Sequence, residues 1–123
     1  MERIFTLDEA RALMPELRRR ADAAVTARAD LAEISAALRA GTPSPLGGVP
    51  ELKAAEARFH EQLAWLEEQG LQVKGVAPLL VDFPATLDGV EVLLCWLEGE
   101  PELAWYHRPE VGFAGRRPLP GTV

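Results

Sequence analysis

The sequence predicts an α+β fold in which a long N-terminal antiparallel helical hairpin packs on a small, mainly antiparallel β-sheet. Three observations predict it. Apolar residues recur at helical spacing over about residues 6–69, a Pro and Gly-rich segment interrupts them at 42–50, and short apolar strand-like runs follow from residue 71. At 123 residues, we expect a single domain with a β-rich part at about 71–116 and a loop tail at 117–123.

The first helix is predicted to begin at a capping box. Residues 6–9 (TLDE) match the S/T-x-x-E pattern, in which the Thr6 and Glu9 side chains accept hydrogen bonds from each other's backbone amides. Gly41 provides a C-terminal cap. Pro15 lacks an amide hydrogen, so we expect a kink there rather than the end of a short helix. The predicted apolar seam is Ala10, Leu13, Leu17, Ala24, Ala27, Leu31, Ile34 and Leu38.

The second helix is predicted to begin at Pro50 and end at Gly70, so the two helices differ in length. At about 1.5 Å per residue, roughly thirty residues span roughly 45 to 50 Å and about twenty span around 30 Å. The remaining seam needs the sheet or a second copy of the chain, unless its end is frayed or solvated. The main functional hypothesis is therefore a non-catalytic interaction or scaffold protein, a homo-oligomer (dimer) that self-associates through coiled-coil-like helices.

Short strands are predicted at 71–74 and 79–83, with Pro84 ending the second. The strongest strand candidates are EVLLCWLE (91–98) and ELAWYH (102–107), joined by a type II′ turn at Gly99.

This tight turn would set the register of the two strands. It places Val92 opposite His107 and Leu94 opposite Trp105. Cys95 then points to the face opposite His107, which predicts a buried structural thiol rather than a nucleophile.

Composition limits the partners. The chain has 13 Lys and Arg against 19 Asp and Glu, a formal charge of -6, so we expect no nucleic-acid binding. One cysteine excludes an internal disulfide. The sequence has no apolar run long enough for a membrane helix, and no secretory signal after its first residues. We therefore expect a soluble cytoplasmic protein with no membrane partner.

His107 and nearby carboxylates suggest a metal or ligand site. Asp82 is expected at the same end of the sheet as His107, and Arg116 could return there after a Gly-containing loop. One alternative is structural: Asp82 pairs with Arg116 while His107 bonds a loop carbonyl. The other is functional: Arg116 and His107 hold an anion, or Asp82 and His107 hold a divalent metal such as zinc or iron, conceivably in an enzyme. Glu98 and Glu100 are expected at the turn, roughly 20 Å from His107, and so cannot join it unless the turn is misplaced or another chain supplies it.

The segment 81–119 also resembles an uncharacterised bacterial family, domain of unknown function 2203, and the similarity covers essentially the whole chain. The family's successive motifs DFP, LCW, GEP, WH and GF-x-G-R correspond here to residues 82–84, 94–96, 99–101, His107 and 112–116. This chain departs from the WH motif, because Tyr106 rather than a tryptophan directly precedes His107 and Trp105 lies one position earlier. The resemblance implies a small bacterial protein without an established activity. It adds weight to five positions without assigning any of them a role: Asp82, Glu98, Glu100, His107 and Arg116. These five residues are our candidate ligand-binding set.

Overall fold

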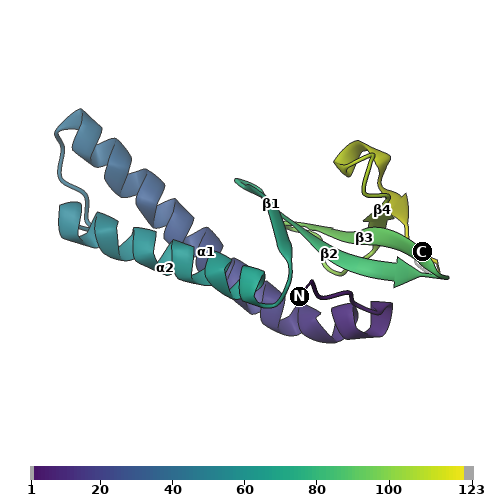
Figure 1. Cartoon of the computed structure of the whole chain (residues 1–123). Coiled ribbons are helices and arrows are strands. Elements are labelled where there is room, and N and C mark those ends of the chain that lie inside the picture. Colours follow the sequence, from purple (N-terminus) through teal and green to yellow (C-terminus); the bar gives the residue numbers. More distant parts are fainter. Residues whose placement is uncertain (1, 121–123) are drawn as a thin grey trace. The chain divides into compact units, whose positions relative to one another are not determined.

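The structure is a computed structural model that describes residues 2–120, and its fold is α+β (Figure 1). Its antiparallel sheet has the strand order β1-β2-β3-β4-β5. The elements are α1 (Leu7–Ala40), α2 (Val49–Glu68), β1 (Gln72–Val76), β2 (Leu79–Leu87), β3 (Val90–Leu97), β4 (Trp105–His107), the short 3-10 helix η1 (Phe113–Gly115) and β5 (Arg117–Pro118). Arg18–Trp65 forms one compact unit and the rest of the described chain another. The single-domain assignment stays a prediction.

The predicted capping box starts α1. The Glu9 amide donates to Thr6 Oγ1 at 3.1 Å, and the Thr6 amide donates to Glu9 Oε1 at 2.8 Å. The bond from the Thr6 amide favours the charged carboxylate, as does a side-chain hydrogen bond from Thr6, so both lower the pKa of Glu9. α1 continues through Pro15, which is exposed, and ends before Gly41, whose positive φ of 70° suits a C-terminal cap.

The helical unit is an antiparallel pair. Arg20 Nη1 donates to Gln62 Oε1 at 3.3 Å, and the Asp30 carboxylate lies 3.6 Å from Arg58 Nη2. Small side chains allow the helices to approach closely. The buried residues of this unit are Ala21, Ala24, Ala27, Ile34, Ala55 and Phe59.

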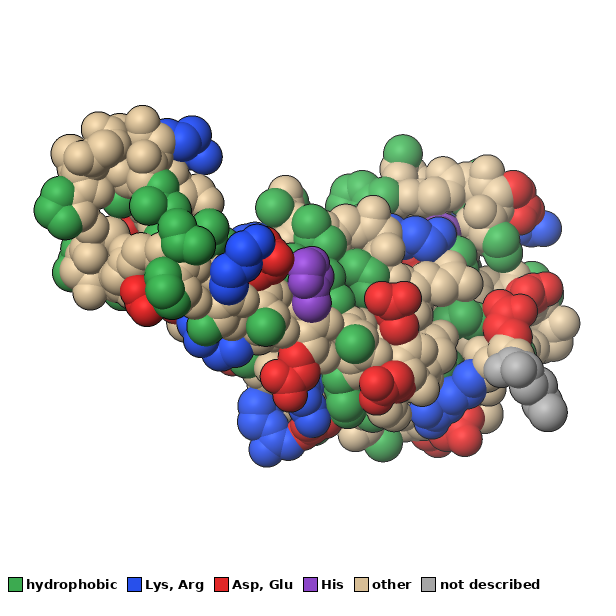
Figure 2. Space-filling model, turned by 60° about the vertical axis from the view of Figure 1, so that its left-hand side comes forward, with side chains coloured by type: hydrophobic (Ala, Val, Ile, Leu, Met, Phe, Trp, Pro, Cys, Tyr) green, Lys and Arg blue, Asp and Glu red, His purple; other side chains and the backbone are tan. Residues whose placement is uncertain are grey.

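Two details of the predicted seam are wrong. Met14 is buried and Leu13 only half-buried, the reverse of the expectation, whereas Ala10 and Leu17 are buried as predicted. Leu38, at the other end of the seam, is 44% exposed. Figure 2 shows hydrophobic side chains at the surface of the helices and charges of both signs interspersed over the face in view.

The prediction that Pro84 ends a strand is also wrong, because β2 continues to Leu87. The backbone nitrogen and carbonyl oxygen of one strand residue point to the same side. On that side the Pro84 carbonyl accepts from the Phe5 amide at 2.7 Å, and Phe5 O accepts from the Thr86 amide at 3.4 Å. Pro84 is therefore tolerated within β2, because the Phe5 segment bonds to its carbonyl and needs no hydrogen on its nitrogen.

The predicted register of β3 and β4 is wrong by one residue. Leu93, not Val92, pairs with His107, and Cys95 pairs with Trp105. Paired residues of antiparallel strands point to the same face, so Cys95 and His107 share a face.

The reason lies in the connection. Gly99 has a positive φ of 97°, but it is the third residue of a turn closed by a 2.9 Å bond from the Glu100 amide to Leu97 O. β4 then begins only at Trp105, so residues 98–104 form a longer loop than a two-residue turn.

Both faces of the sheet carry buried side chains. On one, which we call the cluster face, lie Leu80, Asp82, Leu93, Cys95, Leu97, Trp105 and His107. On the opposite face Phe83 meets the Phe5 ring edge-on, with centroids 5.3 Å apart. Figure 1 shows the first turns of α1 and the η1 segment on different sides of the sheet.

The tail is more ordered than predicted. Arg117 pairs with Tyr106 as part of β5, and the buried Leu119 donates its amide to Ala104 O at 2.8 Å. A pure loop at 117–123 is therefore wrong for its first two residues. Residues 121–123 lie outside the described chain.

Candidate metal centre

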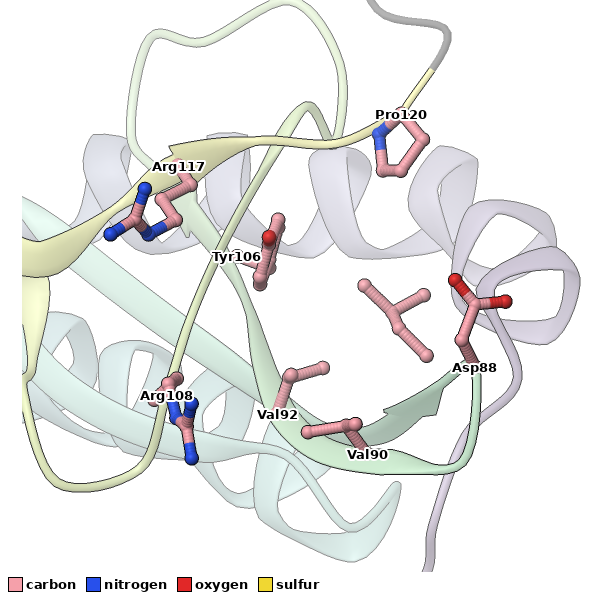
Figure 3. Close-up of a pocket in the computed structure, with 8 residues that line it drawn as sticks. Asp88, Val90, Val92, Tyr106, Arg108, Arg117 and Pro120 are labelled. Carbon is pink, nitrogen blue, oxygen red and sulfur yellow. The ribbon is translucent and has the colours of Figure 1, made fainter.

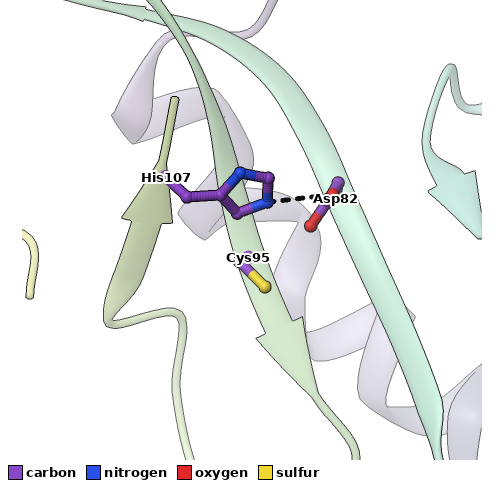
Figure 4. Close-up of side chains that lie close together, drawn as sticks. All are labelled: Asp82, Cys95 and His107. Atoms are coloured by element: carbon purple, nitrogen blue, oxygen red, sulfur yellow. Dashed lines mark hydrogen bonds and ion pairs between the residues drawn. The ribbon is translucent and has the colours of Figure 1, made fainter. Parts of the chain in front are cut away.

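Three side chains of different chemistry meet on the cluster face: Asp82, Cys95 and His107 (Figure 4). They come from three adjacent strands, and the register places Asp82 directly opposite Cys95. One carboxylate oxygen, the sulfur and one ring nitrogen all lie within 4.8 Å of one another. The residues are buried, with exposed fractions of 1%, 0% and 2%.

The imidazole of His107 is held at both nitrogens. Nδ1 lies 2.8 Å from the Arg108 carbonyl oxygen, and Nε2 lies 3.1 Å from Asp82 Oδ2. Because a carbonyl can only accept, Nδ1 carries a hydrogen and donates it. The ring is therefore oriented with Nε2 toward the carboxylate and the thiol. The expected hydrogen bond from His107 to a loop carbonyl is confirmed.

The carboxylate of Asp82 has unequal oxygens. Oδ2 is hydrogen-bonded to His107 Nε2 and lies 3.7 Å from Lys74 Nζ, whose side chain is 45% exposed. Oδ1 is buried and has no hydrogen-bond partner among residues 2–120. A buried carboxylate oxygen without a partner is costly, so this atom requires an explanation.

The thiol of Cys95 is protonated near neutral pH. Burial raises its pKa to about 12, and the neighbouring negative charge of Asp82 adds to the effect. Although Cys95, His107 and Asp82 are adjacent, the high pKa argues against a cysteine nucleophile, which needs a stabilised thiolate.

Arg116 does not pair with Asp82, so that structural prediction is wrong. Its Nη2 donates to Glu100 Oε2 at 2.6 Å. The guanidinium carbon lies 4.8 Å from the centroid of the Trp105 ring and 4.7 Å from that of Phe113. We call this stack of Trp105, Arg116, Phe113 and Glu100 the arginine clasp, and it holds the η1 loop to the cluster face.

The span of these motifs agrees with a known family. A family model described as uncharacterized conserved protein (DUF2203) matches residues 3–119. The chain belongs to this family. Comparison with curated proteins and with solved structures gives no match. Within the described part of this DUF2203 protein, neither helix is long and apolar enough to cross a membrane.

Two other predicted ligand residues of this DUF2203 chain bind backbone atoms. Glu98 Oε1 accepts from the Leu79 amide at 2.9 Å, and Glu100 Oε1 accepts from the Leu97 amide at 2.7 Å. Both carboxylates therefore fix the strand ends and the connecting loop. Neither belongs to the group of clustered metal-ligand atoms.

Sequence reasoning missed Cys95 as a member of the cluster. The residue types were recognised, but the assumed two-residue turn placed the thiol on the wrong face. The available signal was the Asp88-Gly89 pair, which is typical of a two-residue hairpin turn. Such a turn sets Asp82 opposite Cys95, and paired residues share a face.

Proposed function

We propose that this DUF2203 protein binds one divalent transition metal ion through Asp82, Cys95 and His107, with zinc as the preferred ion. The observation that carries the proposal is the buried meeting of an oxygen, a sulfur and a nitrogen ligand within 4.8 Å, with Asp82 Oδ1 lacking a partner in the described chain. Zinc accepts all three ligand types.

The spacing of the ligand atoms supports the proposal. With metal bonds of about 2.0 to 2.3 Å, tetrahedral geometry places ligand atoms roughly 3.3 to 3.7 Å apart. The Asp82 and His107 atoms are already 3.1 Å apart. Small side-chain rotations would bring the whole set, now within 4.8 Å, to this spacing.

The charge balance also supports it. A carboxylate, a thiolate and a neutral imidazole carry two negative charges, which one divalent cation neutralises in a buried site. Metal binding would displace the Cys95 proton, whose pKa is about 12 without a metal, and the proton that lies between His107 Nε2 and Asp82 Oδ2. The remaining hydrogen on His107 Nδ1 stays bonded to the Arg108 carbonyl, the arrangement that commonly orients metal-bound histidines.

Cobalt substitution tests the proposal directly. Because Cys95 is the only cysteine, a sulfur-to-cobalt charge-transfer band in the untagged protein can be assigned to that residue. We expect one cobalt ion per chain, loss of the band in Cys95→Ser, and weaker binding in His107→Ala. His60→Ala is the matched control, since His60 is exposed and outside the cluster.

Two results would contradict the proposal: no cobalt band in the wild-type protein, or an unchanged cobalt spectrum in Cys95→Ser. Either would favour a purely structural Asp82 and His107 pair beside a buried thiol.

Self-association through the helices remains a second proposal. It is supported by exposed apolar side chains around the connector between α1 and α2: Leu38 (44%), Leu46 (38%) and Val49 (55%). Light scattering should show a dimer for the wild type and a monomer for Leu38→Glu. A monomeric wild type at high micromolar concentration would refute self-association. Cytoplasmic location also stays a prediction.

A further inference from the structure

An apolar groove of about 370 Å³ lies on the cluster face beside the proposed metal ligands. Leu80 and Leu97 form part of its wall, with Phe113 and residues 75–78 around them. Leu80 and Leu97 are paired across β2 and β3, two residues along each strand from the two ligands on those strands. At about 3.3 Å per residue, the groove and the cluster are about 7 Å apart along the sheet.

The arginine clasp connects the two features. Phe113 lines the groove and stacks on Arg116, which in turn covers Trp105, the register partner of Cys95. In Figure 4 the Cys95 side chain projects toward the end of β3, where Leu97 lies. The sulfur therefore marks the side of the cluster that is nearer the groove.

The groove also reaches solvent. Two of its lining residues, Val76 and Phe113, are 43% and 46% exposed, whereas the cluster itself is buried. None of the residues that line it carries a charge. A molecule that enters this way would place an uncharged apolar part in the groove.

Three protein ligands leave one position of a tetrahedral zinc ion open, and such sites take water or a substrate atom there. We propose that the groove receives the apolar part of a small molecule whose donor atom occupies this fourth position. The inference rests on the proposed metal site. The chemical class is an aliphatic or aromatic molecule with one metal-coordinating head, such as a carboxylate or thiol.

A series of alkyl hydroxamates on the cobalt-loaded protein tests this inference, with the visible cobalt spectrum as readout. Burial of a methylene group strengthens binding about fourfold. Hexanohydroxamate, with four more methylenes than acetohydroxamate, should therefore bind on the order of 100-fold more tightly. This comparison needs no variant, so it stays valid whatever a substitution does to folding.

A groove-filling variant, Gly75→Val, sharpens the test. Gly75 pairs with Leu80, and an added Cβ would lie 3.6 Å from Leu80 Cβ and 3.3 Å from Pro78 O. The dependence on chain length should fall below about tenfold, while the cobalt spectrum without hydroxamate is unchanged.

The control fills a different hollow. That hollow, of about 460 Å³, includes Val90, Val92 and Tyr106 in its lining on the opposite face of the sheet (Figure 3). Val90→Phe should leave the hydroxamate series as in the wild type.

The outcomes separate the two proposals. No cobalt spectrum in the wild type refutes the metal site, and the groove inference falls with it. A normal cobalt spectrum with hydroxamate affinities that do not depend on chain length refutes the groove inference alone. An equal chain-length dependence in wild type and folded Gly75→Val also refutes it.

Discussion

Replacement of Cys95 by Ser should separate the stability of the metal-free protein from its response to zinc. The thiol is fully buried, and Asp82 Oδ1 has no partner among the described residues. The thiol already interacts with Asp82 through a hydrogen bond, and a serine hydroxyl at this position could donate a stronger one, since a hydrogen bond to a charged group contributes about 1.5 to 3 kcal/mol. This gain offsets the loss of the more apolar sulfur. The metal-free free energy of unfolding should therefore change by less than about 1.5 kcal/mol.

The response to zinc should differ much more. An ion that binds only the folded state stabilises it by about 2.7 kcal/mol when its free concentration is 100 times Kd. For a chain of 123 residues this corresponds to a rise in Tm of roughly 8 to 12 °C. Cys95→Ser replaces a thiolate ligand by a hydroxyl, a much weaker ligand for zinc. Most of the rise should disappear at the same zinc concentration.

Differential scanning calorimetry on untagged protein, with zinc and with a chelator, measures both quantities. His60→Ala is the control and should keep the full zinc response, because its imidazole is exposed and distant from the cluster in sequence. The reasoning fails if Cys95→Ser keeps the wild-type rise in Tm. It also fails if the wild type shows no rise at all.

Three further predictions concern pH and the arginine clasp. Burial raises the pKa of Cys95 from 9.0 to about 12, so above about pH 9 only the unfolded chain loses this proton. In urea unfolding, the free energy of unfolding of the metal-free wild type should therefore fall, relative to that of Cys95→Ser, by up to about 1.4 kcal/mol per pH unit. Arg116→Lys should lower the free energy of unfolding by about 1 to 2 kcal/mol, because lysine cannot stack between two rings. The control Arg108→Lys, at an exposed ion pair, should change it by less than about 0.5 kcal/mol. Equal effects of the two substitutions would contradict the clasp. The pKa of Glu9 is lowered from 4.5, so the stability that Glu9 contributes is present above about pH 4.5 and is lost as the pH falls through its folded-state pKa. The free energies of unfolding of wild type and Glu9→Ala, measured against pH, should therefore converge in acid. A difference between them that does not change with pH would refute this prediction.

The helices and the fold class were predictable because their signals are local. Thr6 and Glu9 lie three residues apart, so their side chains reach each other's amides whatever the rest of the chain does. The two helices also required only the 3.6-residue periodicity and the glycine caps. The exact buried row of α1 was less certain, because Leu13 and Met14 differ by one residue and both are apolar.

The candidate site was harder to predict because it depends on a register. Gly99 does adopt a positive φ, but at the third position of its turn, and the hydrogen bonds of Glu100 extend the connection. A one-residue error of this kind reverses which face each β4 side chain occupies. Asp82 and His107 were still placed near each other, since the order of the strands was right. Arg116 was misassigned because Glu100 comes from the same misread loop.

The short pairing of Phe5 with β2 has a consequence for the behaviour of the chain outside its native state. β1 pairs with β2 only as far as Asp82, so the following stretch of β2 depends on the N-terminal segment for a partner. If residues before α1 were removed, Thr86 and its neighbours would present open backbone donors and acceptors. Strands of other molecules can pair with such an open edge, so the few residues ahead of α1 protect the sheet from aggregation.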